Sequence, residues 1–275
     1  MRILQLQTPV STDKKANLAC LAAQLESFRG QKPDLVTVGE MFTCPYDTQL
    51  FAAYAEEQGG PSWQYLSDLA RKHGIWLQAG SIPERDAAGR IYNTAYMFDP
   101  DGREVAHHRK MHLFDIAIEG GQHFKESDSL SAGDEVTVFD TAFGKMGLMI
   151  CFDIRFVELA RLMVQQGARV ILVPAAFNMT TGPAHWTLNF RSRALDNQCF
   201  MVGTCTARNE KAGYVAYGHS IITSPWGDVV SEMDERAGGK ITDIDITECE
   251  RIRVQLPILS ARREDVYRLM SYQSY

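Results

Sequence analysis

The 275-residue sequence contains few cysteines and no long apolar run. Its six cysteines form no C-x-x-C pair, so we expect neither a disulfide framework nor a cysteine-rich zinc site. No stretch approaches 18 uninterrupted apolar residues, which argues against a transmembrane helix. The first residues, MRILQLQ, lack an apolar signal segment with a cleavage site. We therefore expect the fold to start at residue 1 and the protein to be cytoplasmic.

A large charge excess and nucleotide-binding motifs are also missing. The net charge is −6, whereas a nucleic-acid-binding surface usually needs a basic face. The glycines form neither a P-loop nor a dinucleotide-binding fingerprint, so no nucleotide cofactor is expected. With 45% hydrophobic residues, a chain of this length can bury a core without a metal or a disulfide. The composition is that of an ordinary globular protein.

Apolar periodicity predicts alternating strands and helices. The expected strands are 2–7, 34–38, 75–82, 145–151, 170–173 and 200–206, and the expected helices are 14–30, 61–73, 157–166 and 184–197. Two hairpins are predicted, one pairing 92–98 with 104–108 and one pairing 220–224 with 229–232. No linker or repeat divides the chain, so we expect one α/β domain over residues 1–275. This mixture of βα units and hairpins suits a two-sheet sandwich flanked by helices.

Cys151 is the cysteine most suggestive of chemistry. It stands where the apolar strand 145–151 ends, and ligands gather at the carboxyl ends of strands in α/β sheets. A helix starting just after it would present N–H groups that favour a thiolate and bind an oxyanion. The alternative is an inert thiol, because free cysteines are among the most buried residues.

Two further polar residues lie at comparable strand ends. Glu40 follows the buried strand 34–38, where a carboxylate is costly unless it is paired or functional. Lys110 follows the predicted strand 104–108 and precedes apolar residues. A lysine partly removed from water is a candidate for stabilising negative charge. The alternatives are a helix-capping role for Glu40 and a solvated basic turn for Lys110.

Together, Glu40, Lys110 and Cys151 resemble the Glu–Lys–Cys triad of the nitrilase superfamily of carbon–nitrogen hydrolases. The resemblance covers almost the whole chain. Its carriers are GEMF at 39–42, RKMHLF at 109–114, MICFDIRFVE at 149–158 and PAAFNMTTGPAHW at 174–186, with RSRALDN at 191–197 and YGHS at 217–220. The last three blocks are similar to the Nit branch, and within it to the ω-amidases, which hydrolyse the side-chain amides of 2-oxoglutaramate and 2-oxosuccinamate.

The resemblance implies a role for each matching residue. Cys151 would be the nucleophile, and Glu40 the general base and acid. Lys110 and the backbone N–H of Phe152 would stabilise the oxyanion of the tetrahedral intermediate. Glu126 matches a second glutamate of the family pattern and would be a supporting carboxylate. A thiolate attacks an amide productively only if the departing nitrogen is protonated, and the base that accepts the thiol proton can supply that proton.

Substrate recognition is less specified by the sequence. An ω-amidase substrate carries a carboxylate at its far end, which an arginine can bind. Arg155 is our candidate, with an ion pair to Glu158 as the alternative. Tyr46 and Asn178 are candidates for polar substrate contacts, and the alternative for each is a hydrogen bond within a loop.

The resemblance implies a four-layer αββα sandwich of the nitrilase type. It also implies a homodimer packed through helices, with the C-terminal tail, about 250–275, in contact with the partner. No cofactor is required. His107, His108 and His112 could suggest a metal, but no carboxylate or cysteine completes a recognisable ligand set, so no metal site is expected.

Three other functions are compatible with the sequence. Deaminated-glutathione amidase shares the triad and much of the GPAHW region at 182–186. A non-catalytic interaction module on the same fold is a rival of another class, because fold alone does not fix function. A redox-sensing role for Cys151 is the third. We expect hydrolysis of a small-molecule amide through a cysteine thioester, with release of ammonia.

Overall fold

Two stacked β-sheets form the centre of the computed structural model, which describes residues 1–120 and 122–272. One six-stranded sheet has the order β14-β1-β2-β3-β4-β5, formed respectively by Gly238–Asp243, Arg2–Gln7, Leu35–Val38, Trp76–Arg85, Ile91–Phe98 and Glu104–Arg109. The other has the order β13-β12-β11-β10-β9-β8, formed respectively by Val229–Glu232, Ile221–Thr223, Phe200–Cys205, Val170–Ala175, Gly144–Leu148 and Thr137–Thr141.

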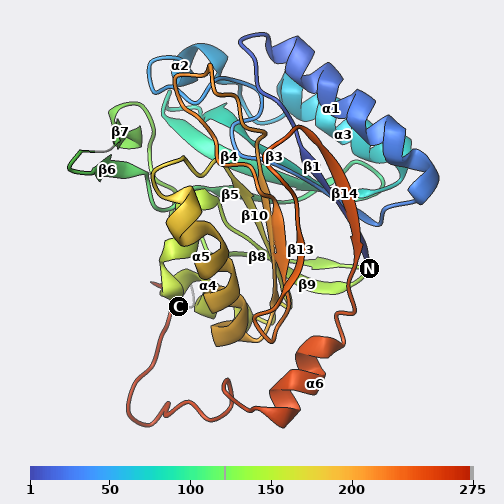
Figure 1. Ribbon diagram of the computed structural model, residues 1–275, viewed down its shortest axis with the longest axis vertical. Helices are drawn as coiled ribbons and strands as arrows, with labels where there is room; N and C mark the ends of the chain where they lie inside the picture. The colour runs from blue at the N-terminus through green and yellow to red at the C-terminus, as the bar shows by residue number, and fades with distance from the viewer. Residues whose placement is uncertain (121, 273–275) are drawn as a thin grey trace.

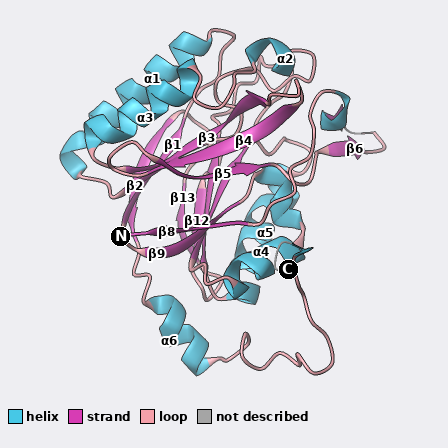
Figure 2. Ribbon diagram, turned by 180° about the vertical axis from the view of Figure 1, so that it is seen from behind, coloured by secondary structure: helices cyan, strands magenta, loops and turns pink. Residues whose placement is uncertain are grey.

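Helices cover the outer face of each sheet. Helices α1 (Lys14–Phe28) and α3 (Pro61–His73) pack on the β1-containing sheet. Helices α4 (Val157–Gln165) and α5 (Gly182–Asn197) pack on the β10-containing sheet. The two helix pairs lie on opposite sides of the strands (Figures 1 and 2). The predicted four-layer αββα sandwich is therefore confirmed.

Strand β1 shows how alternation builds these layers. Its Leu4 and Leu6 belong to the apolar cluster that includes the α1 and α3 side chains, whereas Ile3 belongs to the cluster of the second sheet. The Gln5 amide, on the same face as Ile3, donates 2.8 Å to the Gly203 carbonyl of β11. The period of two along a strand thus supplies one face to the helices and one to the sheet interface.

The connecting elements are short. They are α2 (Phe51–Tyr54), the hairpin β6 (Asp115–Ala117) and β7 (His123–Lys125), and the 3-10 turns η1 (Arg29–Gln31), η2 (Glu126–Asp128) and η3 (Cys151–Arg155). After α6 (Glu248–Gln255), the chain extends away from the sandwich and returns beside α4 (Figure 1).

The expected strand 145–151 is shorter in the structure. Strand β9 ends at Leu148, and Cys151 instead begins η3 with a φ of +44°. The apolar run continues past the strand because Met149 and Ile150 are also buried. Strand β8 and the β6–β7 hairpin were not predicted, because their residues lack a long apolar alternation.

Within the described residues, no helix is both long and apolar enough to cross a membrane.

Candidate active site

Strand ends from both sheets bring Glu40, Lys110 and Cys151 into one buried cluster. Glu40 comes two residues after β2, Lys110 directly after β5, and Cys151 three residues after β9. The side chains of Glu40 and Lys110 are fully buried, and Cys151 is 6% exposed. Gly39 allows the close approach of the sheets, because a Cβ there would lie 2.7 Å from the Thr206 amide nitrogen.

The Lys110 ammonium is held between two carboxylates. Its Nζ lies 2.9 Å from Glu40 Oε1 and 2.9 Å from Glu126 Oε2. Burial alone would lower the pKa of Lys110, but the charges of Glu126 and Glu40 outweigh it and raise the pKa above its ordinary value. Lys110 therefore stays cationic and can stabilise further negative charge nearby.

The two oxygens of Glu40 have different surroundings. Oε1 accepts hydrogen bonds from Lys110 Nζ at 2.9 Å and Asn93 Nδ2 at 2.8 Å, and the Tyr46 hydroxyl lies 3.0 Å away. Oε2 is buried and has no hydrogen-bond partner within residues 1–120 and 122–272. A buried carboxylate oxygen with a free lone pair is suited to receive a proton.

Cys151 is a protonated thiol in this environment. Burial raises its pKa well above the ordinary value, and the negative charge of Glu40 raises it further, while Lys110 opposes both. A thiol of this kind becomes a nucleophile only when a neighbouring base takes its proton. All six cysteines are free, so Cys151 is not consumed in a disulfide.

Glu126 fixes the other side of the ammonium. Its Oε2 accepts a 2.6 Å hydrogen bond from the Phe114 amide, and its Oε1 accepts one from the Tyr46 hydroxyl. Burial raises the pKa of Glu126, and Glu40 adds to that effect, while Lys110 opposes it. Lys110, Tyr46 and the Phe114 amide therefore hold the Glu126 carboxylate in place.

The backbone turns sharply at Cys151. The φ of +44° places it in the left-handed region, which is unusual for a residue with a side chain. The Asp153 amide bonds to the Ile150 carbonyl at 2.9 Å and closes the first turn of η3. The amide of Phe152 lies at the start of this turn, where N–H groups lack the acceptor of a preceding turn. The Phe152 amide therefore belongs to the turn that Cys151 begins.

Arg155 lines the same narrow pocket as Cys151. Its guanidinium lies 5.0 Å from the centroid of the Phe177 ring, and one nitrogen lies 3.0 Å from His185 Nδ1. Among the residues that the structure describes, no carboxylate forms an ion pair with Arg155, so the alternative pairing with Glu158 is not formed. Burial lowers its pKa, since no carboxylate compensates for the lost water.

Tyr46 and Asn178 occupy different surroundings. Tyr46 belongs to the Glu40–Lys110–Glu126 cluster, and its ring stacks on Tyr214 at 4.5 Å between centroids. Asn178 accepts hydrogen bonds from the Thr181 amide at 2.8 Å and the Thr181 hydroxyl at 3.0 Å. These bonds of Asn178 correspond to the loop-bonding alternative, although the residue also borders the Cys151 pocket.

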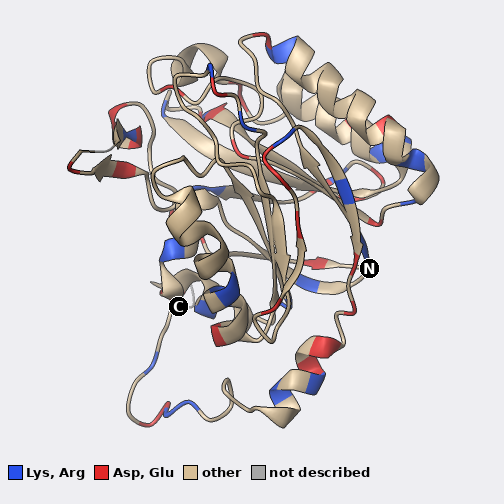
Figure 3. Cartoon of the chain, viewed as in Figure 1, with Lys and Arg blue, Asp and Glu red and all other residues tan. Residues whose placement is uncertain are grey.

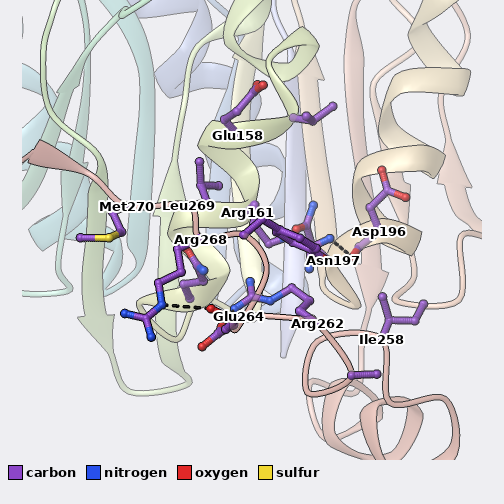
Figure 4. Close-up of a pocket in the computed structure, with 14 residues that line it drawn as sticks. Glu158, Arg161, Asp196, Asn197, Ile258, Arg262, Glu264, Arg268, Leu269 and Met270 are labelled. Carbon is purple, nitrogen blue, oxygen red and sulfur yellow. Dashed lines mark hydrogen bonds and ion pairs between the residues drawn. The ribbon is translucent and has the colours of Figure 1, made fainter.

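Two cavities border the cluster. The pocket of Cys151 and Arg155 is narrow, about 10 Å³, which is room for one water molecule. A cavity of about 660 Å³ borders Glu40 and Tyr46, and Tyr214 lines both. A separate cavity of about 830 Å³ lies between α4, α5 and residues 258–270, and no triad residue lines it (Figure 4).

The structure also reveals contributors that local patterns did not single out. Asn93, inside β4, donates to Glu40, and Tyr214 lines both cavities. Asp153 binds two histidines and two backbone amides. Its place two residues after Cys151 was a usable signal, whereas Asn93 and Tyr214 carry no local one. In the described part of the chain, no group of three or more His, Cys, Asp or Glu residues could hold a metal.

Comparison with known proteins adds sequence and structural relatives. Residues 1–254 match the family model described as "Carbon-nitrogen hydrolase". Omega-amidase NIT2 of Bos taurus is 43% identical over 273 residues, covering 99% of both chains. Omega-amidase NIT2-A of Xenopus laevis is 46% identical over 262 residues, covering 95% of this chain and 94% of that one. The crystal structure of Saccharomyces cerevisiae Nit3, a member of branch 10 of the nitrilase superfamily, superposes with a TM-score of 0.88 at 39% identity, covering 96% of each chain.

Proposed function

The chain belongs to the carbon–nitrogen hydrolase family, and we propose that it is an ω-amidase that hydrolyses small dicarboxylate monoamides such as 2-oxoglutaramate or 2-oxosuccinamate. The observation that carries this choice is Arg155, a partly buried guanidinium without a carboxylate partner among the described residues, in the pocket of Cys151. A substrate carboxylate would supply the missing partner.

In the proposed reaction, Glu40 starts as the base. Its free Oε2 takes the thiol proton of Cys151, and the thiolate attacks the amide carbonyl. Lys110 and the Phe152 amide stabilise the resulting oxyanion. Because Lys110 is already cationic and fixed between two carboxylates, little reorganisation is needed when charge develops.

Glu40 then acts as an acid. It returns the proton to the amide nitrogen, the C–N bond breaks, and ammonia leaves while the acyl group remains on Cys151 as a thioester. Water enters, Glu40 takes one of its protons, and the hydroxide attacks the thioester. The carboxylic acid departs, and the proton returns to the Cys151 sulfur. Ammonia is thus released before the acid.

Glu126 and Tyr46 have supporting roles in this scheme. Glu126 binds Lys110 as a second carboxylate beside Glu40, and the Tyr46 hydroxyl donates to Glu126 and lies 3.0 Å from Glu40 Oε1. Without Glu126, the ammonium would lose one of its two carboxylate partners. Asn178 borders the Cys151 pocket and is the third candidate for a substrate contact, although its amide oxygen already accepts hydrogen bonds from Thr181.

The substrate is tested by measuring ammonia release from 2-oxoglutaramate and from deaminated glutathione in parallel. We expect the first to have the higher kcat/KM, because its carboxylate can reach Arg155 from a short acyl chain. A higher kcat/KM for deaminated glutathione would show that the proposed substrate is wrong, although the proposed mechanism would still apply. No turnover of either by the folded protein would contradict the proposed function and favour a binding module.

We also propose that residues 1–275 act as one domain in a cytoplasmic homodimer. Support for the dimer comes from large apolar side chains left exposed on α4, α5 and the tail, namely Val157, Leu188, Leu195, Val266 and Tyr267. In α6 the acidic residues come first and the arginines follow, and both arginines and acidic residues occur along the tail (Figure 3). The free cysteines are compatible with a reducing compartment.

A further inference from the structure

We infer that Asp153 is a positioning residue that holds the nucleophile turn and the Lys110 segment in register. Its carboxylate is fully buried. Oδ2 accepts from the Ile150 amide at 3.0 Å and lies 3.1 Å from His108 Nε2. Oδ1 accepts from the His112 amide at 2.9 Å and lies 2.7 Å from His112 Nδ1.

These contacts join two segments that are distant in sequence. Ile150 immediately precedes Cys151, so its amide belongs to the nucleophile turn. His108 and His112 lie two residues on either side of Lys110. Asp153 is therefore a single carboxylate that ties the turn after β9 to the end of β5 and the residues that follow it.

Each of the two histidines that Asp153 contacts is also held by a second contact. The His112 ring is stacked on Phe156, with centroids 3.5 Å apart and planes 10° apart. His108 lies 3.0 Å from the Thr137 hydroxyl through its other nitrogen. Both imidazoles are thus held at two places, so Asp153 contacts rigid partners rather than mobile side chains.

This register matters because the two expected oxyanion donors come from the two joined segments. Lys110 belongs to one segment and the Phe152 amide to the other. The turn at Cys151 also has an unfavourable positive φ, which persists only when surrounding bonds hold it. A displacement near 1 Å between such groups costs on the order of 10²-fold in rate.

The charge of Asp153 is part of the attachment. Burial alone would raise the pKa of Asp153, but hydrogen bonds from His108 and His112 outweigh it, and the pKa lies well below its usual range. The carboxylate is therefore ionised at neutral pH. An amide of the same shape could not accept all four contacts, because one of its two polar atoms is a donor.

The test compares Asp153→Asn with the matched control Glu84→Gln. Glu84 is a buried carboxylate, 2% exposed, that binds Arg109 next to Lys110 but does not contact the nucleophile turn. Each variant is assayed for hydrolysis of 2-oxoglutaramate and of 4-nitrophenyl acetate, and for alkylation of Cys151 by iodoacetamide. Rates are expressed per titrated active-site thiol, which removes differences in the folded fraction.

We expect Asp153→Asn to lower kcat on both substrates on the order of 10²-fold with KM nearly unchanged. Alkylation should change far less, because it needs the thiol but no oxyanion donors. Glu84→Gln should leave kcat per site near that of the unmodified chain. Unchanged kcat in Asp153→Asn, or alkylation falling in parallel with kcat, would overturn the inference.

The inference rests on the proposed function only for its natural substrate. If the unmodified chain fails on 2-oxoglutaramate, the proposed function fails, and 4-nitrophenyl acetate still tests Asp153. If Asp153→Asn does not fold, His112→Ala provides the second variant, because the His112 side chain is 28% exposed. We expect His112→Ala to lower kcat about tenfold, since it removes one of the contacts. An unchanged kcat would overturn the inference.

Discussion

In the proposed mechanism, Cys151 and Glu40 act as one proton-sharing pair. Burial and the Glu40 charge raise the pKa of Cys151, so the resting enzyme holds a thiol rather than a thiolate. Within the residues that the structure describes, Glu40 Oε2 has no hydrogen-bond partner and can accept the thiol proton. Reactivity then depends on proton transfer to Glu40 rather than on a permanently charged sulfur.

This arrangement predicts how alkylation of Cys151 depends on pH. A raised pKa moves thiolate formation to higher pH, so the alkylation rate should still be rising at about pH 10. Glu40→Gln removes a negative charge that raises the pKa, and its profile should therefore shift to lower pH. The measurement is the rate of iodoacetamide labelling in a Cys20→Ser background. An upward shift, or none, would contradict the pairing.

Arg155 gives a second prediction at the scale of a residue. Arg155→Met should raise KM for 2-oxoglutaramate about 10- to 100-fold, because a charge-assisted hydrogen bond contributes about 1.5–3 kcal/mol. An uncharged amide such as butyramide serves as the control and should be affected little. Equal losses on both substrates would mean that Arg155 maintains the pocket rather than recognising a carboxylate.

At the scale of elements, the site depends on where strands end and how closely the sheets pass. Glu40 and Lys110 lie just beyond β2 and β5, and Gly39 faces the end of β11. The Thr37 and Thr204 hydroxyls, 2.6 Å apart, join the same two sheets. The interface between the sheets is therefore both close and polar near the catalytic cluster.

Gly39→Ala tests this close approach. The added Cβ would lie 2.7 Å from the Thr206 nitrogen and 2.9 Å from the Cys205 carbonyl carbon, so backbone would have to move. We expect a loss of about 1–3 kcal/mol in the free energy of unfolding, measured with urea. Gly30→Ala is the control, because nothing lies within 4 Å of its added Cβ. Equal stability of both variants would show that the sheets can separate without cost.

Elements with strong patterns could be predicted from the sequence, and long-range partners could not. Strand β1 and helix α3 lie within the predicted bounds, because apolar spacing and Pro61 mark them clearly. The Asn93–Glu40 hydrogen bond joins residues 53 positions apart, and only the assembled sheet creates it. Cys151 was expected at the end of a strand but begins η3, three residues after β9 ends, because the buried apolar run continues past the strand.

At the scale of the whole molecule, several large apolar side chains are exposed on α4, α5 and the tail. Leu188 on α5 is 63% exposed, and Val157 at the start of α4 is 47% exposed. Tyr267, in the tail that returns beside these helices, is 59% exposed. Side chains of this size, gathered on neighbouring elements, are typical of an association surface.

The dimer proposal makes a hydrodynamic prediction. Sedimentation of the full chain should give about twice its mass of 30.9 kDa. Leu188→Glu should shift the protein toward the monomer, because it places a charge in the proposed interface, with little effect on the fold at so exposed a position. Tyr65→Glu is a control on α3, which packs on the other sheet, and its side chain is 38% exposed. A monomeric full chain would contradict the proposal.

The thioester mechanism is tested most directly by measuring ammonia release from 2-oxoglutaramate by Cys151→Ala. Cys205→Ala is the matched control, because Cys205 is also buried and lies outside the triad. We predict that Cys151→Ala loses activity by a factor on the order of 10⁵ or more while remaining folded. Cys205→Ala should retain most of the activity. Turnover by Cys151→Ala within about tenfold of the unmodified chain would contradict a thioester mechanism at this residue.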